Sequence, residues 1–187
     1  MTLREVRAPV ELVGERLLLR EFRGEDWQAV HRYASDPEVC RFMNWGPNGE
    51  AETKDFIERR LRAAEERPRR SFGLVVTLRD TEDVIGSCGL TVSKPEHRQG
   101  WIGYCFARAY WGRGYATEAA RLLVKLGFEM IGLHRIFATC DSENAASARV
   151  LEKTGMRLEG RLRSDDFVKG RWRDSLLFAI LEDDPRP

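Results

Sequence analysis

The sequence is poor in the two residue types that most often build metal sites. Its 187 residues include four cysteines and three histidines. No two of the cysteines (Cys40, Cys88, Cys105 and Cys140) have Cys-x-x-Cys spacing, which argues against a zinc site. Isolated cysteines in strand-like segments are usually reduced and buried, as is typical of a cytoplasmic protein. We therefore expect a cytoplasmic protein without a bound metal.

The sequence also lacks a long apolar run and an excess of charge of either sign. The longest stretch without a charged residue, Val84–Ser93, covers ten residues, whereas a membrane-spanning helix needs about 18 or more. The N-terminal residues show no apolar core of the kind found in signal peptides. With 31 basic and 30 acidic residues the formal net charge is +1, so no overall field favours nucleic acid. We expect neither a membrane nor direct nucleic-acid binding.

The length and the apolar pattern indicate one domain, residues 1–187, that contains both helices and strands. Strands are predicted near 17–20, 72–78, 84–93, 101–106, 135–140, 157–168 and 172–181. Helices are predicted across 27–34 and 50–66, from Pro37, after the loop at 111–116, and from Asn144 to about 154. This order predicts an α/β (α+β) fold with a mixed, mostly antiparallel sheet of about seven strands and helices on both faces. It excludes a doubly wound parallel sheet.

The most specific local pattern is a glycine-rich loop between a predicted strand and a predicted helix. The segment WGRGYA at 111–116 follows the strand that ends near Phe106. Its two glycines and small alanine allow backbone N–H groups to converge at the positive end of the helix, which suits a phosphate. The loop lacks the Gly-Lys-Ser/Thr of a Walker A motif, and Thr117 stands where a Rossmann fingerprint needs glycine. A tight turn that needs glycine only for positive φ is the alternative.

Two segments resemble the cofactor motifs of the GNAT-type N-acetyltransferase superfamily. YWGRGYATEA at 110–119 resembles its acetyl-CoA signature, and NAASARVLEKTGM at 144–156 resembles its second cofactor segment. The resemblance covers about residues 12–181. Within the superfamily the chain looks most similar to the ribosomal-protein N-terminal acetyltransferases, the Rim group. Trp111, in place of the more general Gln or Arg, is common in that group. The resemblance implies the GNAT acyltransferase fold, with acetyl-CoA as co-substrate and no metal.

The resemblance also implies which residues bind the cofactor. In the superfamily the strand before the loop splays from its parallel neighbour, here 135–140, and its backbone pairs with the pantetheine amides. Asn144, which is also a good helix N-cap, bonds the pantetheine arm, and Ser147 lies one turn later on the same face. The implied cofactor-binding residues are Tyr104, Cys105, Phe106, Trp111, Gly112, Arg113, Gly114, Tyr115, Ala116, Thr117, Asn144 and Ser147.

A pair of catalytic residues follows from the Rim group. A serine matching Ser147 is the candidate acid for the departing thiolate, and a glutamate at the position of Asp166 is the candidate base for the amine. The superfamily often has a tyrosine acid where this chain has Leu151, so another donor is needed. Asp166 is one methylene shorter than glutamate, so action through a water stays open, as does a plain surface-charge role. If the strand is regular, Asp165 points to the opposite face.

The implied activity is transfer of acetyl from acetyl-CoA directly to a primary amine. The N-terminal α-amine of a ribosomal or other protein is favoured, because an α-amine titrates near pH 8 and a lysine near about 10.4. The alternatives are a small amine such as an amino sugar or polyamine, a CoA-binding module without catalysis, and Cys105 as a covalent nucleophile. The aromatic loop at 42–49 is expected either at the acceptor or in the core. A homodimer also stays open.

Overall fold

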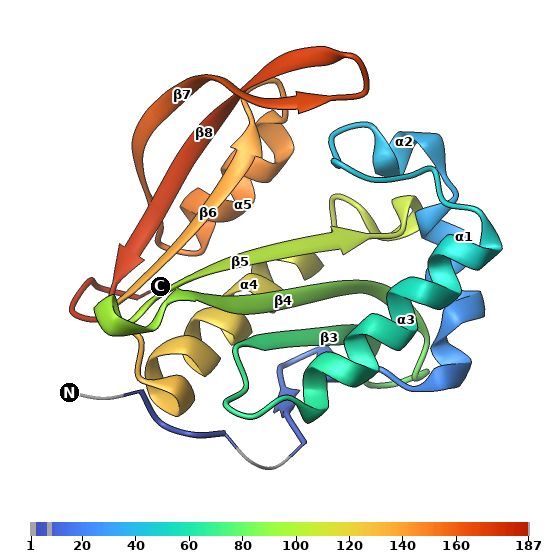
Figure 1. The fold of residues 1–187 in the computed structure, drawn as a ribbon, viewed down its shortest axis with the longest axis horizontal. Coiled ribbons are helices and arrows are strands. Elements are labelled where there is room, and N and C mark those ends of the chain that lie inside the picture. Colours follow the sequence, from blue (N-terminus) through green and yellow to red (C-terminus); the bar gives the residue numbers. More distant parts are fainter. Residues whose placement is uncertain (1–2, 7–8, 187) are drawn as a thin grey trace.

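The computed structural model describes residues 3–6 and 9–186 and places a single mixed sheet at the centre of the molecule (Figure 1). Within the described residues the sheet has eight strands in the order β1-β2-β3-β4-β5-β6-β8-β7. Every neighbouring pair is antiparallel except β5 and β6, which are parallel. The strands are β1 (Glu11–Val13), β2 (Leu17–Glu21), β3 (Ser71–Leu78), β4 (Val84–Lys94), β5 (Gln99–Phe106), β6 (Arg135–Asp141), β7 (Arg157–Val168) and β8 (Arg171–Leu181).

This arrangement confirms the predicted mixed, mostly antiparallel sheet with one strand more than expected. The additional strand is β1, in which only Leu12 is buried. Three residues are too few for an alternating pattern to stand out in the sequence. β1 forms because it pairs with β2 at the edge of the sheet.

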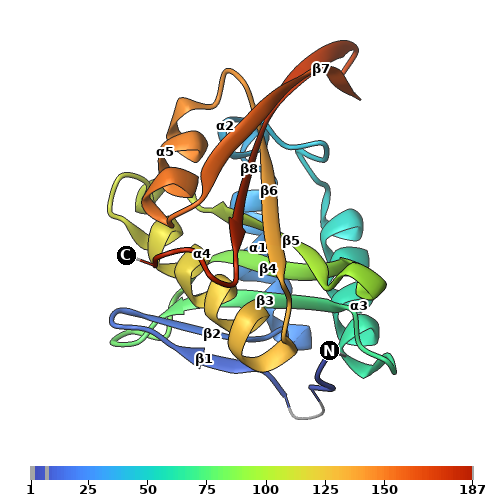
Figure 2. The ribbon, with the colours of Figure 1, turned by 90° about the vertical axis from the view of Figure 1, so that its left-hand side faces the viewer.

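Helices cover both faces of the sheet. Figure 2 shows α4 and α5 on one side and α3 on the other. The helices are α1 (Trp27–Ala34), α2 (Pro37–Cys40), α3 (Glu50–Glu65), α4 (Tyr115–Lys125) and α5 (Ala145–Lys153), with a π-helical extension of α4, η4 (Leu126–Ile131), and 3-10 turns η1 (Gly24–Asp26), η2 (Pro95–His97) and η3 (Arg108–Tyr110). None of the described helices is long and apolar enough to span a bilayer.

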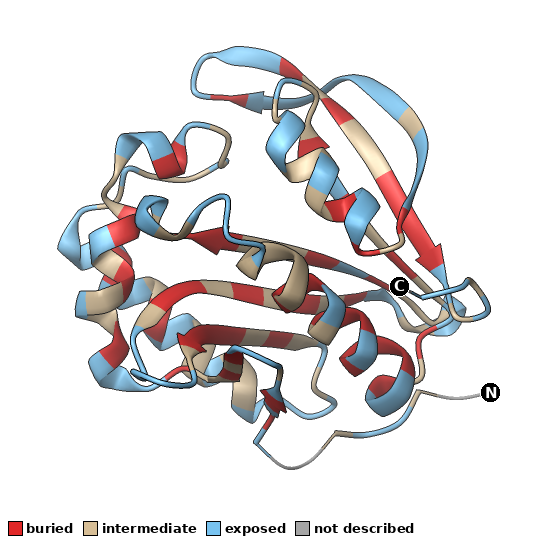
Figure 3. Ribbon diagram, turned by 180° about the vertical axis from the view of Figure 1, so that it is seen from behind, coloured by how far each residue is buried: buried red, intermediate tan, exposed pale blue. Residues whose placement is uncertain are grey.

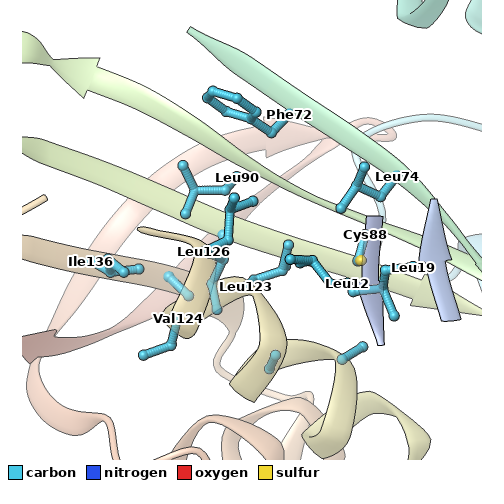
Figure 4. Packing of buried hydrophobic residues seen from close by; sticks show 14 of the residues in the cluster. Leu12, Leu19, Phe72, Leu74, Cys88, Leu90, Leu123, Val124, Leu126 and Ile136 are labelled. Atoms are coloured by element: carbon cyan, nitrogen blue, oxygen red, sulfur yellow. The ribbon is translucent and has the colours of Figure 1, made fainter. Parts of the chain in front are cut away.

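The buried apolar residues form two clusters, one on each face of the sheet. Figure 3 marks the buried positions in red along the central strands and the helices that cover them. The side chains of β3 alternate between them, so that Phe72 and Leu74 enter the larger cluster and Val75 enters the smaller one. In the larger cluster these side chains pack against α4 and its extension (Figure 4). The labelled members include Leu19, Leu90, Leu123, Leu126 and Ile136.

The parallel pairing of β5 with β6 is short. Its register runs only from Gln99–Arg135 to Trp101–Phe137. A Cβ added to Gly100 would lie 2.8 Å from the Thr91 carbonyl oxygen and 2.9 Å from a Leu133 methyl group, so glycine allows the close approach at this junction. Beyond it the two strands diverge, as Figure 1 shows, and the predicted splay is present.

A charged cluster lies beside the β5–β6 junction. Glu182 Oε1 accepts a hydrogen bond from Arg98 Nη2 at 2.8 Å and lies 2.9 Å from His134 Nδ1. Arg98 Nη1 also donates to the Gly132 carbonyl at 3.2 Å. The cluster therefore connects the turn before β5, the start of β6 and the residue after β8.

The cluster gives a pH-dependent prediction for Glu182→Gln. His134 first, and then Arg98, lower the pKa of the Glu182 carboxyl. A carboxyl whose pKa is lower in the folded state stabilises the fold above its unfolded pKa of about 4.3, and this stabilisation disappears as the pH falls through the folded value. We expect Glu182→Gln to unfold at lower urea concentration than the unmutated protein at pH 7, and we expect this difference to shrink as the pH is lowered from 5 toward 3.

Glu96→Gln is the matched control. Glu96 Oε1 also lies near a histidine, 3.9 Å from His97 Nε2, but both side chains are well exposed. If the urea concentration at which Glu182→Gln unfolds is lower than that of the unmutated protein by the same amount at pH 7 and at pH 3, the carboxylate charge does not have the predicted role.

Candidate functional site

The divergence of β5 and β6 opens a cavity of about 870 Å³. This volume is within the range of about 300–1,000 Å³ that is usual for small-molecule sites. Residues 102–105 of β5 and 137–141 of β6 line it, together with parts of α1, α3, α5, the 42–48 loop and the β7–β8 hairpin. Segments from most of the chain therefore meet around one space.

The cavity brings together five of the residues that the resemblance implied. They are Tyr104, Cys105, Asn144, Ser147 and Asp166. Phe106, the last residue of β5, and the loop at 111–117 beyond it lie outside the lining. Phe106 is instead buried in the core, and its carbonyl accepts a hydrogen bond from the Trp111 indole at 2.8 Å.

Two hydroxyl groups meet on the cavity wall. Tyr104 Oη lies 3.0 Å from Ser147 Oγ. Burial raises the pKa of Tyr104, so the phenol keeps its proton at neutral pH. Ser147 is fixed in turn, because its backbone N–H donates to Asn144 Oδ1 at 3.0 Å at the start of α5. The sequence required a donor in place of Leu151 but did not show that Tyr104 stands beside Ser147.

The position of Cys105 argues against nucleophilic catalysis. The residue is only 8% exposed, and burial raises the pKa of its thiol to about 12. A thiol with such a pKa is almost wholly protonated at neutral pH and is a poor nucleophile. The four cysteines are all buried and free, and the described residues contain no cluster of three metal-ligating side chains.

The glycine-rich loop has the backbone conformation of an anion site. Gly112 and Gly114 have φ values of +72° and +81°. The Glu118 N–H donates to the Gly114 carbonyl at 3.1 Å as the first backbone bond of α4. The N–H groups of residues 115–117 precede it, at the helix end where amides have no intrahelical partner. This conformation is expected for a phosphate site and also for a tight turn that needs glycine, and one loop can be both.

Arg16 fixes this loop from the start of β2. Its backbone N–H and its Nε donate to the two carboxylate oxygens of Glu118 at 2.8 and 2.9 Å. Its Nη1 donates to the Arg113 carbonyl at 2.9 Å, and its guanidinium stacks on the Tyr115 ring. No local pattern in the sequence indicates this contact, because 102 residues separate Arg16 from Glu118.

The strand that carries Asp166 is not regular, so the condition under which Asp165 was predicted to point to the opposite face is not met. The pairs Leu162–Ser175 and Asp166–Arg173 are consecutive in the register, so residues 163–165 bulge from β7. Asp174 fills the bulge by accepting hydrogen bonds from Ser164 N at 2.9 Å and Arg161 Nε at 2.8 Å. The alternation of faces therefore ends at the bulge. Asp166 is exposed and lines the cavity, whereas Asp165 does not line it.

The aromatic loop lies both on the cavity wall and against the core, so the expected core packing is present and the acceptor role stays a prediction. Phe42, Met43 and Trp45 line the cavity, and the last two also pack against the smaller core cluster. Two side chains of the β7–β8 hairpin cross to the segment before this loop. Lys169 Nζ donates to the Cys40 carbonyl at 2.6 Å, and Arg173 Nη2 donates to the Arg41 carbonyl at 3.2 Å. We call these two contacts the hairpin bridge.

A family model described as an acetyltransferase (GNAT) domain matches residues 16–157. The chain belongs to the GNAT family. It is 37% identical over 175 residues to an uncharacterized N-acetyltransferase, YnaD, of Bacillus subtilis, covering 94% of this chain and 99% of that protein. It is also 26% identical over 165 residues to spermidine N(1)-acetyltransferase of Escherichia coli, covering 88% and 85% of the two chains.

Solved structures of GNAT enzymes share this fold. A GNAT-family acetyltransferase from Bacillus anthracis matches with a TM-score of 0.84 at 35% identity, over 94% of this chain and 100% of that one. Mycobacterium smegmatis RimJ in complex with CoA-disulfide matches with a TM-score of 0.80 at 28% identity, over 97% and 90%. The GNAT chain is therefore an N-acetyltransferase, and enzymes of this family use acetyl-CoA and an amine-bearing substrate. The predictions of family, Rim-like neighbours and enzyme class are confirmed.

The loop geometry gives a prediction for CoA binding. Gly114→Val should weaken CoA binding by about tenfold or more, because valine at φ +81° is strained and its side chain obstructs close approach of a phosphate. Titration calorimetry with CoA measures the effect.

Gly160→Val is the control, because a Cβ at Gly160 meets no atom within 4 Å. Unchanged CoA affinity in a folded Gly114→Val variant would show that the loop is only a turn.

Proposed function

We propose that this acetyltransferase acetylates the N-terminal α-amine of a peptide or protein. The observation that carries the proposal is the unpaired carboxylate of Asp166 on the same cavity as the Tyr104–Ser147 hydroxyl pair. Among the described residues Asp166 makes no hydrogen bond or ion pair, so its oxygens are available to an amine. A carboxylate base and hydroxyl donors around one space are the groups that amine acetylation needs.

The cofactor fits the divergent strands. The edge of β5 beyond Trp101 has no strand partner on the β6 side, so its amide groups suit the pantetheine arm. The N–H groups at the start of α4 suit the pyrophosphate. Asn144, the N-cap of α5, and Ser147 in the first turn of α5 line the same cavity.

Proton transfers accompany both halves of the reaction. The acceptor ammonium gives a proton to Asp166, directly or through a water, and the neutral nitrogen attacks the thioester carbonyl. When the tetrahedral intermediate breaks down, the C–S bond opens and the CoA sulfur takes a proton from Ser147, whose Oγ lies 3.0 Å from Tyr104 Oη. The nitrogen, which is positively charged after the attack, loses its second proton, and this proton restores the hydroxyl pair. The protonated thiol of Cys105 supports this direct transfer.

The α-amine is favoured as acceptor because a larger fraction of it is neutral at pH 7. About a tenth of an α-amine is neutral at pH 7, against less than about a thousandth of a lysine amine. The similarity to RimJ supports a peptide acceptor, and the similarity to spermidine N(1)-acetyltransferase favours a polyamine as the second candidate.

A panel of acceptors tests the proposal. We expect faster release of free CoA thiol from acetyl-CoA with alanyl and seryl peptides than with spermidine or glucosamine. If spermidine or glucosamine is acetylated much faster than every peptide, the small-amine candidate is correct.

The assigned base gives a second prediction. Asp166→Asn should lower kcat by about 10²–10⁴ with little change in CoA affinity, because the amide cannot accept the ammonium proton. Steady-state kinetics between pH 6 and 9 measure the loss.

Asp165→Asn is the matched control, since Asp165 is also exposed but does not line the cavity. Near-normal turnover of Asp166→Asn across this pH range would reject Asp166 as the base.

A further inference from the structure

A buried ion pair lies on the cavity wall beside Asp166. Arg173 Nη1 is 3.4 Å from Asp141 Oδ2, and the two side chains are only 7% and 5% exposed. Both residues line the cavity. The register explains the cluster: Arg173 is directly opposite Asp166, and Ser175, two residues along β8, is directly opposite Asp141. All four side chains therefore belong to one face of the sheet.

The hydrogen bonding of this pair is incomplete. A charge-assisted N–H···O bond is about 2.7–2.9 Å long, and the observed separation of 3.4 Å exceeds it. Asp141 Oδ2 and Arg173 Nε are buried and have no hydrogen-bond partner among the described residues. Each side chain makes a hydrogen bond to the backbone of another residue. Asp141 Oδ1 accepts from the Glu143 N–H at 2.8 Å, and Arg173 Nη2 donates to the Arg41 carbonyl.

One unpaired acceptor and one unpaired donor of opposite charge match the start of a peptide chain. Building on the proposed function, we infer that Asp141 and Arg173 together recognise the terminal amine and the first carbonyl of the acceptor. The guanidinium turns from Asp141 toward the cavity and donates from Nε to the carbonyl oxygen. An amine N–H then donates to Asp141 Oδ2, so a long ion pair is exchanged for two direct hydrogen bonds.

This exchange discriminates between classes of amine. A polyamine brings a cation that can replace Arg173 beside Asp141, but it brings no carbonyl oxygen for the displaced guanidinium. A buried charge that loses its partner is strongly unfavourable. The pair thus selects an amine with an adjacent carbonyl, whereas Asp166 alone would accept any amine.

Two probes isolate the carbonyl. The first is an alanyl peptide, and the second is the same peptide with an E-alkene in place of its first peptide bond, which keeps the amine and the shape but removes the oxygen. We expect Arg173→Met to reduce the ratio of kcat/KM for the two probes by about tenfold, mainly through KM for the alanyl peptide. Arg173→Lys should restore part of the ratio. Asp141→Asn should raise KM for both probes and leave the ratio unchanged.

The controls come from a neighbouring ion pair. Arg171 on β8 and Glu143 beside Asp141 form an exposed pair at 3.2 Å that does not line the cavity. Arg171→Gln and Glu143→Gln should leave both KM values unchanged. Unchanged CoA affinity shows that a variant is folded. If Arg173→Met does not fold, the ratio is measured with Arg173→Lys instead.

The outcomes separate this inference from the proposed function. If the unmutated enzyme acetylates the alanyl peptide but both Arg173 variants keep the full ratio, or Asp141→Asn keeps both KM values, the inference alone is overturned. If the unmutated enzyme acetylates spermidine and not the peptide, the proposed function fails and the inference fails with it.

Discussion

The early end of the pairing between β5 and β6 is the constraint on which the rest of the structure depends. The two strands pair at only three residue pairs, where Gly100 leaves room for the Thr91 carbonyl and the Leu133 side chain, and beyond Trp101 and Phe137 their facing edges are free. Unpaired edges inside a protein are normally unfavourable, because their N–H and C=O groups lose water. A cofactor with amides along its length fits such edges, and under the proposed function the interruption of the sheet is where the pantetheine arm binds. The cluster at Glu182, the two cores and α4 hold the strands on either side of this interruption.

The groups around the cavity come from both sides of the divergence. Tyr104 belongs to β5, Ser147 to α5, and Asp166 and Arg173 to the hairpin after β6. Their relative positions therefore depend on the angle between the two halves of the sheet. The short junction sets that angle together with contacts that span the two halves, which include the hairpin bridge, the Arg98–Glu182 ion pair and the Tyr104–Ser147 contact.

The sequence predicted features that depend on local spacing. The glycine pattern predicted the positive φ values at Gly112 and Gly114, and Asn144 accepts the hydrogen bond from Ser147 N–H that its position as an N-cap predicted. Seven of the eight strands were also predicted, because each carries enough apolar residues to show a pattern. The features that were missed depend on contacts between distant segments. These are the pairing of β1, the bonds from Arg16 to Glu118, the Tyr104–Ser147 contact and the ion pair of Asp141 with Arg173. The bulge at 163–165 was missed because Asp174, on another strand, stabilises it.

The hairpin bridge has a topological consequence. The Lys169 and Arg173 contacts join one wall of the cavity to the other, so the chain forms a ring around the space between them. A loop that continues in both directions cannot be threaded through a ring unless the ring opens. A chain end can enter while the ring stays closed. For the polypeptide acceptor that we propose, access through the closed ring would thus admit the tip of the chain and not its middle, before any side chain of the acceptor is recognised.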